Sequence, residues 1–216
     1  MAVDMIEEEL RKKMAKQLRP GKTALIVVDV QNDFCHNQGI FGKRNFNLSY
    51  VEKAVNNILH FMDQCRQYNL PIVFVRTLHS SWTDSESWIG RMEGAAREMP
   101  ICRPESWGAE FYKVKPLAGD FIVTKHRFSG FVGTDLDLVL RSKGIETLLM
   151  TGVATNVCVE TTARDGFNRD YRIILVEDCC AAFSEEEHAS TITNMSKYFG
   201  IVTNSEVLME LIAKLK

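Results

Sequence analysis

The sequence predicts an α/β fold in which helices cover both faces of a six-stranded, mostly parallel sheet. Short runs of apolar residues alternate along the chain with segments whose apolar residues recur at helical spacing. Such alternation is typical of βαβ units, whose parallel strands are buried on both faces. The predicted strands are residues 24–28, 71–75, 121–123, 147–150, 172–176 and 200–203, the last of them near an edge.

Helices are predicted between these strands. The first links the first two strands, because its apolar residues follow the i, i+3, i+4, i+7 rule and form one buried stripe: Val55, Ile58, Leu59, Met62 and Cys65. Others are expected to begin near residues 135 and 185, the second marked by a capping box of Ser184 and Glu187. A leading helix within residues 1–20 precedes the first strand.

Composition and charge are those of one ordinary globular domain spanning residues 1–216. Apolar residues make up 45% and charged residues 25%, and a net charge of -2 provides no field that would attract nucleic acid. The charged first 18 residues lack the apolar core of a signal peptide, and no run approaches the roughly 18 apolar residues that cross a bilayer. We therefore expect a cytoplasmic protein with a small-molecule ligand and no membrane or nucleic-acid partner.

Residues 78–119 are the exception to this regularity. They hold all three tryptophans, Trp82, Trp88 and Trp107, but show no sustained periodicity. Loops of such length are usually functional or disordered, and the aromatic content argues against disorder. A lid or part of a subunit interface is expected here; the alternative is an insertion packed on its own side chains.

Three polar side chains follow predicted strands: Asp29 after the first, Lys125 after the third and Cys158 shortly after the fourth. Ligands of open α/β sheets bind beyond the carboxyl ends of the strands, so these residues are expected to meet there. Each alone has a structural explanation, as a turn cap, a solvent-reaching lysine or a core cysteine. Together they supply a base, a charge that stabilises a thiolate, and a nucleophile. A helix predicted over residues 156–168 would further favour the thiolate with its positive end.

The segments that carry these residues resemble the signature segments of the isochorismatase-like cysteine hydrolases. They are ALIVVDVQNDF at 24–34, Thr124-Lys125 and GVATNVCV at 152–159. The resemblance extends from about residue 23 to residue 207. It implies a Rossmann-like, doubly wound, three-layer α/β/α sandwich and a fold shared with enzymes that cut C–N bonds of small amides.

The resemblance also implies a mechanism. Asp29 takes the proton of Cys158, whose thiolate attacks the carbonyl carbon to form a covalent acyl-enzyme, while Lys125 holds the pair by charge. A cis peptide between Val153 and Ala154 is implied as well. The backbone N–H groups of Ala154 and Cys158 would then form the oxyanion hole.

Two segments, 125–131 and 154–167, most resemble the ureidoacrylate amidohydrolase branch, which implies an N-carbamoyl or ureido acid as substrate. Arg127 is expected to pair with a substrate carboxylate and Asn156 with the ureido group; the alternative for Arg127 is a structural ion pair with a nearby acidic residue. The other residues expected to bind substrate are Phe34, His79 and Trp82.

No metal and no cofactor is expected. Nicotinamidases of the superfamily carry a metal-binding Asp-x-His after the second strand, where this chain has Thr77-Leu78-His79 and so lacks the carboxylate ligand. The six cysteines form no Cys-x-x-Cys pair, the histidines show no His-x-x-x-His spacing, and the cysteines are expected to be free thiols.

The residues are also compatible with other functions. A nicotinamidase-like or other small-amide hydrolase is the alternative within the same class. From another class come a catalytically silent binding protein and a thiol redox sensor that uses Cys158 or the adjacent Cys179 and Cys180. A dinucleotide-binding protein is disfavoured because no G-x-G-x-x-G follows the first strand. By resemblance, a homo-oligomer, dimer or tetramer, is expected.

Overall fold

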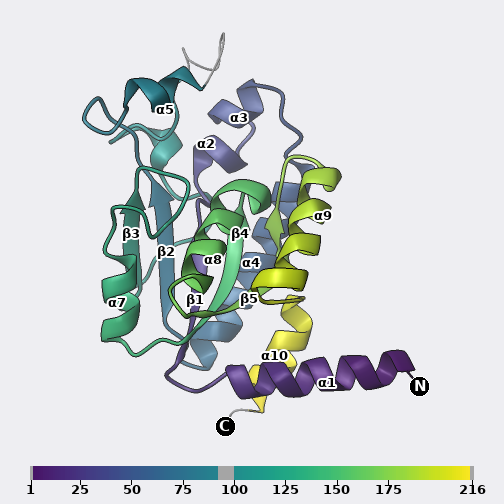
Figure 1. The fold of residues 1–216 in the computed structure, drawn as a ribbon. Coiled ribbons are helices and arrows are strands. Elements are labelled where there is room, and N and C mark those ends of the chain that lie inside the picture. Colours follow the sequence, from purple (N-terminus) through teal and green to yellow (C-terminus); the bar gives the residue numbers. More distant parts are fainter. Residues whose placement is uncertain (1, 92–99, 215–216) are drawn as a thin grey trace.

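The computed structural model, which describes residues 2–91 and 100–214, contains the predicted six-stranded sheet (Figure 1). Every strand pair is parallel, so the sheet is more uniform than the mostly parallel one that was predicted. The strands are β1 Thr23–Val28, β2 Ile72–Thr77, β3 Phe121–Lys125, β4 Thr147–Val153, β5 Arg172–Ala181 and β6 Ile201–Thr203.

The strand order is β3-β2-β1-β4-β5-β6, which confirms the doubly wound arrangement. The chain starts at β1 in the middle of the sheet, adds β2 and β3 on one side, and then returns to add β4, β5 and β6 on the other. The order therefore reverses between β1 and β4. In such sheets the ligand crevice lies at this reversal, beyond the carboxyl ends of the two central strands.

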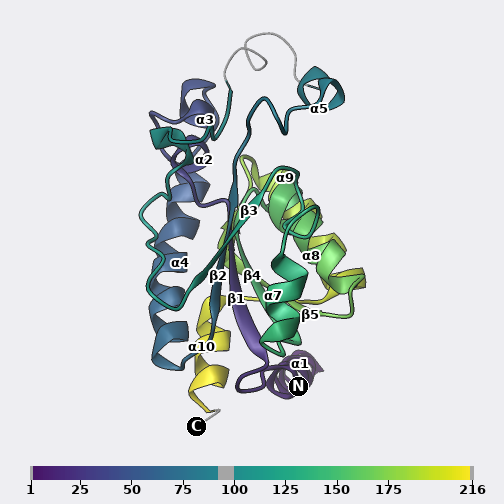
Figure 2. The same cartoon turned by 90° about the vertical axis from the view of Figure 1, so that its left-hand side faces the viewer.

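Helices cover both faces of the sheet (Figure 2). One layer holds α4 Ser49–Gln67 and α10 Ser205–Ala213, and the other holds α7 Leu136–Ser142, α8 Glu160–Phe167 and α9 Glu185–Asn194. Because successive side chains of a strand point to opposite faces, Leu25 and Val27 of β1 pack toward the first layer while Ile26 and Val28 pack toward the second. This is why β1 is buried along its whole length and is apolar from Ala24 to Val28.

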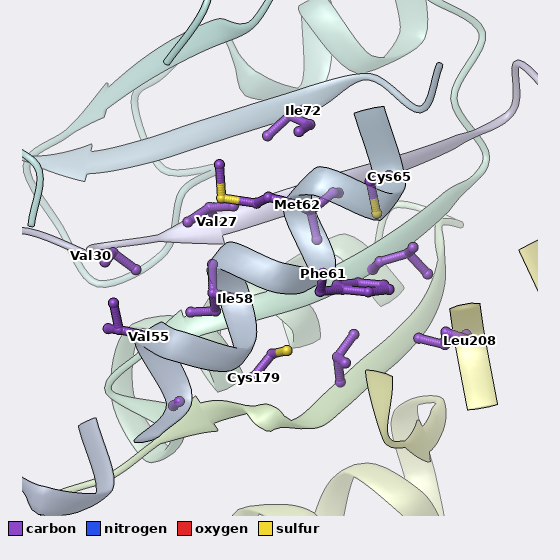
Figure 3. Close-up of a cluster of buried hydrophobic side chains, with 14 of the residues drawn as sticks. Val27, Val30, Val55, Ile58, Phe61, Met62, Cys65, Ile72, Cys179 and Leu208 are labelled. Carbon is purple, nitrogen blue, oxygen red and sulfur yellow. The ribbon is translucent and has the colours of Figure 1, made fainter. Parts of the chain in front are cut away.

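The core between the sheet and α4 follows the predicted stripe (Figure 3). Val55, Ile58, Met62 and Cys65 are buried and pack with strand residues. Phe61 adds a fully buried ring to the same cluster, whereas Leu59 is only partly buried. The apolar side of this helix is therefore wider than one stripe.

The two ends of the sheet are covered differently (Figure 1). The leading helix α1 Ala2–Gln17 lies across the amino ends, anchored by buried Met14 and by an ion pair between Arg11 and Glu210. Short helices lie beyond the carboxyl ends: α2 Asn32–Cys35, α3 Ile40–Lys43 and α5 Glu86–Gly90. No described helix has the length and apolar character needed to cross a membrane.

Strands β4 and β5 run past their predicted ends at residues 150 and 176. In β5 the acidic pair Glu177 and Asp178 interrupts the apolar pattern, which hid the continuation. The carboxylate of Asp178 is accommodated because it accepts hydrogen bonds from the backbone N–H and the hydroxyl of Ser205, at 2.7 and 2.6 Å. Ser184 does cap α9, since its hydroxyl accepts the N–H of Glu187.

The segment 78–119 contains α5 and a short 3₁₀ turn, Trp107–Ala109, and residues 92–99 of it lie outside the described part of the chain. The Trp107–Ala109 turn packs near α2, where the side-chain amide of Asn32 donates to the carbonyl of Trp107 at 2.8 Å. The parts of the segment at α5 and at the Trp107–Ala109 turn thus lie beyond the carboxyl ends of the strands (Figure 1), whereas its last residues run back along α4, where Arg66 donates to the carbonyl of Lys115. Its expected part in a subunit interface stays a prediction.

Candidate active site

Asp29, Lys125 and Cys158 meet at the reversal of the strand order. The Nζ atom of Lys125 lies 2.7 Å from Oδ2 of Asp29 and 3.4 Å from the sulfur of Cys158. Asp29 and Lys125 are each only 1% exposed. A carboxylate, an ammonium and a thiol that are far apart in the sequence thus form one contiguous group.

Asp29 is positioned by the end of β1. Its backbone leaves the strand with a φ of 52°, in the left-handed region that aspartate tolerates better than most residues. Two backbone hydrogen bonds hold this conformation, one from the Asp29 N–H to the carbonyl of Val75 and one from the Gln31 N–H to the carbonyl of Asp29, both 2.8 Å. The turn directs the carboxylate into the crevice rather than along the sheet.

Lys125 reaches Asp29 across a strand. It ends β3, and β2 lies between β3 and β1, so two interstrand spacings of about 4.8 Å separate the backbones. The side chain passes over Thr77, its register partner on β2, and its ammonium donates to the Thr77 hydroxyl at 2.7 Å. A further bond to the carbonyl of Arg127 at 3.1 Å holds the ammonium in place.

The hydroxyl of Thr77 links Asp29 to Lys125. Its hydroxyl donates to Oδ1 of Asp29 at 2.9 Å while it accepts from Lys125. Gln31 fixes Thr77 in turn, accepting its N–H at 2.7 Å and donating to its carbonyl at 2.9 Å. The amide of Gln31 also donates to the carbonyl of Ala109, which ties the 78–119 segment to the site.

Cys158 lies in a π-helical turn, Thr155–Val159, that leads into α8, so the helix predicted over 156–168 begins in a wider form than expected. The turn is closed by hydrogen bonds from the N–H groups of Val157 and Val159 to the carbonyl of Ala154. The Val153–Ala154 peptide before it is cis. Gly152 lets β4 approach β1 here, because a Cβ atom at this position would meet the carbonyl oxygen of Val28 at 2.0 Å.

The surroundings of the Cys158 thiol act on its pKa in opposite directions. Burial raises its pKa to about 12, and the negative charge of Asp29 acts in the same direction. Lys125 lowers the pKa but does not offset burial. A raised pKa favours the protonated thiol, so attack by the sulfur requires that this proton leave.

Lys125 remains charged although it is buried. Burial alone would lower its pKa, but the negative charge of Asp29 and the hydrogen bonds to Asp29 and Cys158 raise it above the ordinary lysine value. A buried ammonium is stable only when it is paired and hydrogen-bonded, as it is here. The site thus holds a fixed positive charge next to the sulfur.

These groups open into a cavity of about 260 Å³. Most of its wall is apolar and aromatic, with a few polar groups that converge on it, as is usual for small-molecule sites. Of the residues expected to bind substrate, Phe34, His79, Arg127 and Asn156 line the cavity. The structure therefore brings these four together with Asp29, Lys125 and Cys158.

Trp82 was expected in this pocket and is not there. Its side chain is 96% exposed, whereas Trp88, six residues further on, lines the cavity. Both tryptophans belong to the aperiodic 78–119 segment, so no periodic pattern distinguishes the one that enters the pocket. The difference arises because Trp88 lies on α5, which turns it toward Phe128 at a ring-centroid distance of 4.8 Å.

His79 is a neutral pocket residue. Burial lowers its pKa to about 4, although Asp84 opposes the shift from 3.5 Å away. Asp84 is itself paired with Arg103 at 2.5 Å. Among residues 2–91 and 100–214 there is no group of three or more His, Cys, Asp or Glu side chains that would hold a metal ion. The absence of a metal requirement stays a prediction.

Sequence reasoning missed several lining residues. Thr77 was noted only as the replacement of a metal ligand, because its contacts depend on the β2–β3 register. Arg91 lines the cavity from just beyond α5, in the aperiodic segment. Phe41, Phe46 and Phe183 also line it; the Phe-rich stretch 34–46 was the one signal that could have found the first two.

A doubly wound α/β sheet with an aspartate, a lysine and a cysteine at its reversal point defines the class of isochorismatase-like hydrolases. The model of the isochorismatase domain matches residues 23–207. Ureidoacrylate amidohydrolase RutB of Pseudomonas savastanoi pv. phaseolicola is 32% identical over 205 residues, which cover 87% of this chain and 82% of the relative.

Solved structures give the same result. A cysteine hydrolase from Pseudomonas syringae pv. phaseolicola superimposes with a TM-score of 0.81 at 26% identity, covering 93% of this chain and 96% of the other. N-carbamoylsarcosine amidase from Thermoplasma acidophilum gives a TM-score of 0.69 at 31% identity, covering 86% and 97%. The chain belongs to the isochorismatase family and is a hydrolase with small-amide hydrolases among its relatives.

Proposed function

We propose that the protein hydrolyses a C–N bond of a small N-carbamoyl or ureido acid, with Cys158 as the nucleophile. The observation that carries the proposal is the position of the Lys125 ammonium, within contact distance of both the carboxylate of Asp29 and the sulfur of Cys158. This arrangement supplies a proton acceptor, a nucleophile and a fixed charge around one reacting carbon.

The first half of the reaction transfers the acyl group to sulfur. The proton of Cys158 moves to Asp29 as the sulfur forms a bond to the substrate carbonyl carbon. The developing oxyanion accepts hydrogen bonds from the backbone N–H groups of Ala154 and Cys158. When the carbonyl re-forms, the C–N bond breaks, and the departing nitrogen takes the proton from Asp29.

The second half releases the acid. Water adds to the acyl carbon and gives its proton to Asp29, which is again a carboxylate after the first half. The C–S bond then breaks, and the sulfur of Cys158 recovers the proton from Asp29. Lys125 remains an ammonium throughout, and its charge stabilises each transient anion on the sulfur.

Two features support a ureido or N-carbamoyl acid. The side-chain oxygen of Asn156 is buried and has no hydrogen-bond partner among the described residues, so a substrate N–H would satisfy it. The guanidinium of Arg127 lines the cavity and would bind a carboxylate. The relatives named as ureidoacrylate amidohydrolase and N-carbamoylsarcosine amidase are consistent with such a substrate.

A thiol redox sensor fits the cysteines less well. Reactive sensor thiols have lowered pKa values and exposed sulfurs. Burial instead raises the pKa of the Cys158 thiol, and it does the same for Cys179 and Cys180, both of which are buried. A raised thiol pKa at Cys158 suits a nucleophile that is activated by Asp29 during the reaction better than a thiol that is oxidised directly.

The proposal is tested by ammonia release from a panel of N-carbamoyl amino acids, ureido acids, nicotinamide and simple amides. The wild type is compared with Cys158→Ala and with Cys65→Ala, a matched control at a buried cysteine in the α4 core. We expect turnover of an N-carbamoyl or ureido acid that Cys158→Ala loses and Cys65→Ala retains. Full activity of Cys158→Ala on the best substrate would refute the mechanism.

A further inference from the structure

Two guanidinium groups face the cavity on one side. Arg91 and Arg127 both line it, and both lie over the ring of Trp88, with their central carbons 3.5 and 4.9 Å from its centroid. Trp88 and Phe128 are the apolar surfaces beneath them. Stacking on aromatic rings fixes a guanidinium in orientation while its N–H donors remain available at the edge.

Neither guanidinium is in an ion pair with a described residue, although the charge of Asp84, which is paired with Arg103, acts on Arg91. Arg127 donates to the backbone carbonyls of Thr83 and His126, at 3.0 and 2.7 Å, and Arg91 donates to the carbonyl of Trp88. No ion pair with a carboxylate of the described residues is formed by either. Burial lowers the pKa of Arg91, and the nearby positive charge of Arg127 lowers it further, while Asp84 opposes the shift. Such a pair is complementary to an anion.

Four phenylalanines form a wall on another side of the same cavity. Phe41 contacts Phe34, Phe46 and Phe183 at ring-centroid distances of 5.2, 4.7 and 4.8 Å, and Phe46 contacts Phe183 at 5.0 Å. All four line the cavity. We call this group the phenylalanine wall. Phe41 belongs to α3, and Figure 2 shows α3 and α5 on opposite sides of the upper end of the sheet.

Negative and positive side chains line different parts of the cavity. Glu187, on the exposed first turn of α9, lines the cavity together with Phe183, whereas Arg91 and Arg127 lie just after the ends of α5 and β3. A substrate carboxylate would be repelled by Glu187 and attracted by the two arginines. The wall then faces the part of the substrate that carries no charge.

We propose that the site selects N-carbamoyl or ureido acids with an apolar side chain. The carboxylate lies at Arg91 and Arg127, the side chain packs on the phenylalanine wall, and the carbamoyl carbon is presented to Cys158. This substrate preference rests on the proposed function and specifies the class of substrate for it. A compact acid such as N-carbamoylglycine would leave the wall uncovered and would gain nothing from it.

The experiment is a series of kcat/KM values for N-carbamoylglycine, N-carbamoylalanine, N-carbamoylleucine and N-carbamoylphenylalanine, with both enantiomers where they exist. We expect kcat/KM to rise from glycine to leucine or phenylalanine by at least about tenfold, the effect of added methylene groups in an apolar pocket. N-carbamoylleucinamide, which lacks the carboxylate, should be a poorer substrate than N-carbamoylleucine.

Two variants separate the parts of the pocket. Phe46→Ala, at a ring that is 42% exposed and therefore tolerant of replacement, should reduce the ratio of leucine to glycine substrates. Arg91→Gln should raise KM for N-carbamoylleucine and reduce the preference for the acid over the amide. Arg141→Gln, an exposed arginine on α7 outside the cavity, serves as the control and should change neither ratio.

The outcomes are distinguishable. If turnover depends on Cys158 but kcat/KM is as high for N-carbamoylglycine as for N-carbamoylleucine, the proposed substrate class is wrong. The proposed function would still hold. Turnover of the amide equal to that of the acid, unchanged in Arg91→Gln, would overturn the role of the arginines. Absence of Cys158-dependent hydrolysis from the whole series and from simple amides would overturn the proposed function as well.

Discussion

The hydroxyl of Thr77 lies 2.9 Å from Oδ1 of Asp29 and donates a hydrogen bond to it. The other carboxylate oxygen, Oδ2, forms the ion pair with Lys125. Asp29 is therefore held on both oxygens by groups that are themselves fixed by the sheet, since Thr77 and Lys125 are register partners on β2 and β3. We infer that this pairing sets the direction in which Asp29 presents its basic oxygen to Cys158.

The first prediction concerns Thr77. Thr77→Val keeps the shape of the side chain but removes the donor to Asp29 and the acceptor for Lys125. Hydrogen bonds to charged groups contribute about 1.5–3 kcal/mol, so kcat should fall roughly 10- to 150-fold with a smaller change in KM. Steady-state kinetics measure this. Thr77→Ser, which restores the hydroxyl, should recover most of the activity, and equal activity of the valine and wild-type enzymes would contradict the role.

A second prediction separates catalysis from thiol reactivity. Burial and Asp29 both raise the pKa of Cys158, whereas Lys125 lowers it. Asp29→Asn removes one raising charge and leaves Lys125, so the thiolate fraction at a given pH should increase. We expect the variant to lose hydrolysis yet react faster with iodoacetamide at Cys158, followed by peptide mass spectrometry. In the wild type, the alkylation rate should keep rising with pH through the mildly alkaline range, because the pKa of about 12 lies above it.

The opposite order of alkylation rates would contradict this prediction. If Asp29→Asn reacted more slowly than the wild type, the carboxylate would be activating the resting thiol rather than raising its pKa. The same labelling of Cys65→Ala, which leaves the site intact, provides the reference rate.

A third prediction tests the core that supports the site. Phe61 is fully buried against the sheet in the cluster of Figure 3, so Phe61→Ala should lower the free energy of unfolding by about 3–5 kcal/mol. Urea unfolding followed by circular dichroism measures the change. Leu138→Ala, at a side chain that is 69% exposed, should change it by about 0.5 kcal/mol or less. Similar losses in both variants would show that burial does not determine stability here.

A fourth prediction concerns metals. The Asp-x-His ligand pair is replaced by Thr77 and His79, and His79 is directed at Asp84. Treatment with EDTA followed by gel filtration should therefore leave activity unchanged. Inactivation that zinc or iron reverses would identify a metal site that includes His79.

Much of the sheet and the central group could be predicted from the sequence. Asp29 directly follows an apolar strand and Lys125 ends another, and a parallel sheet places such positions along one edge. Thr77 could not be assigned its role in the same way, because its contacts depend on the register between β2 and β3, which apolar runs do not determine. Arg91 and Trp88 escaped prediction for a different reason, since their segment has no periodicity from which side-chain directions follow.

The pKa of Cys158 shows the limit of reasoning from charges alone. A nearby lysine and a helix amino end both favour a thiolate, and the sequence contains both. The degree of burial decides the direction of the pKa shift, and burial depends on how α2, α3 and α5 lie over the carboxyl ends of the strands. That packing is a property of the folded chain.

The central claim is that the substrate's acyl group becomes bonded to Cys158 during turnover. Rapid acid quenching of the enzyme with its best substrate, followed by peptide mass spectrometry, tests this most directly. We predict a peptide containing residue 158 whose mass is increased by that acyl group, absent from Cys158→Ala and present in Cys65→Ala. Turnover with no such adduct at any quench time, in an enzyme whose Cys158→Ala variant is still active, would contradict the account.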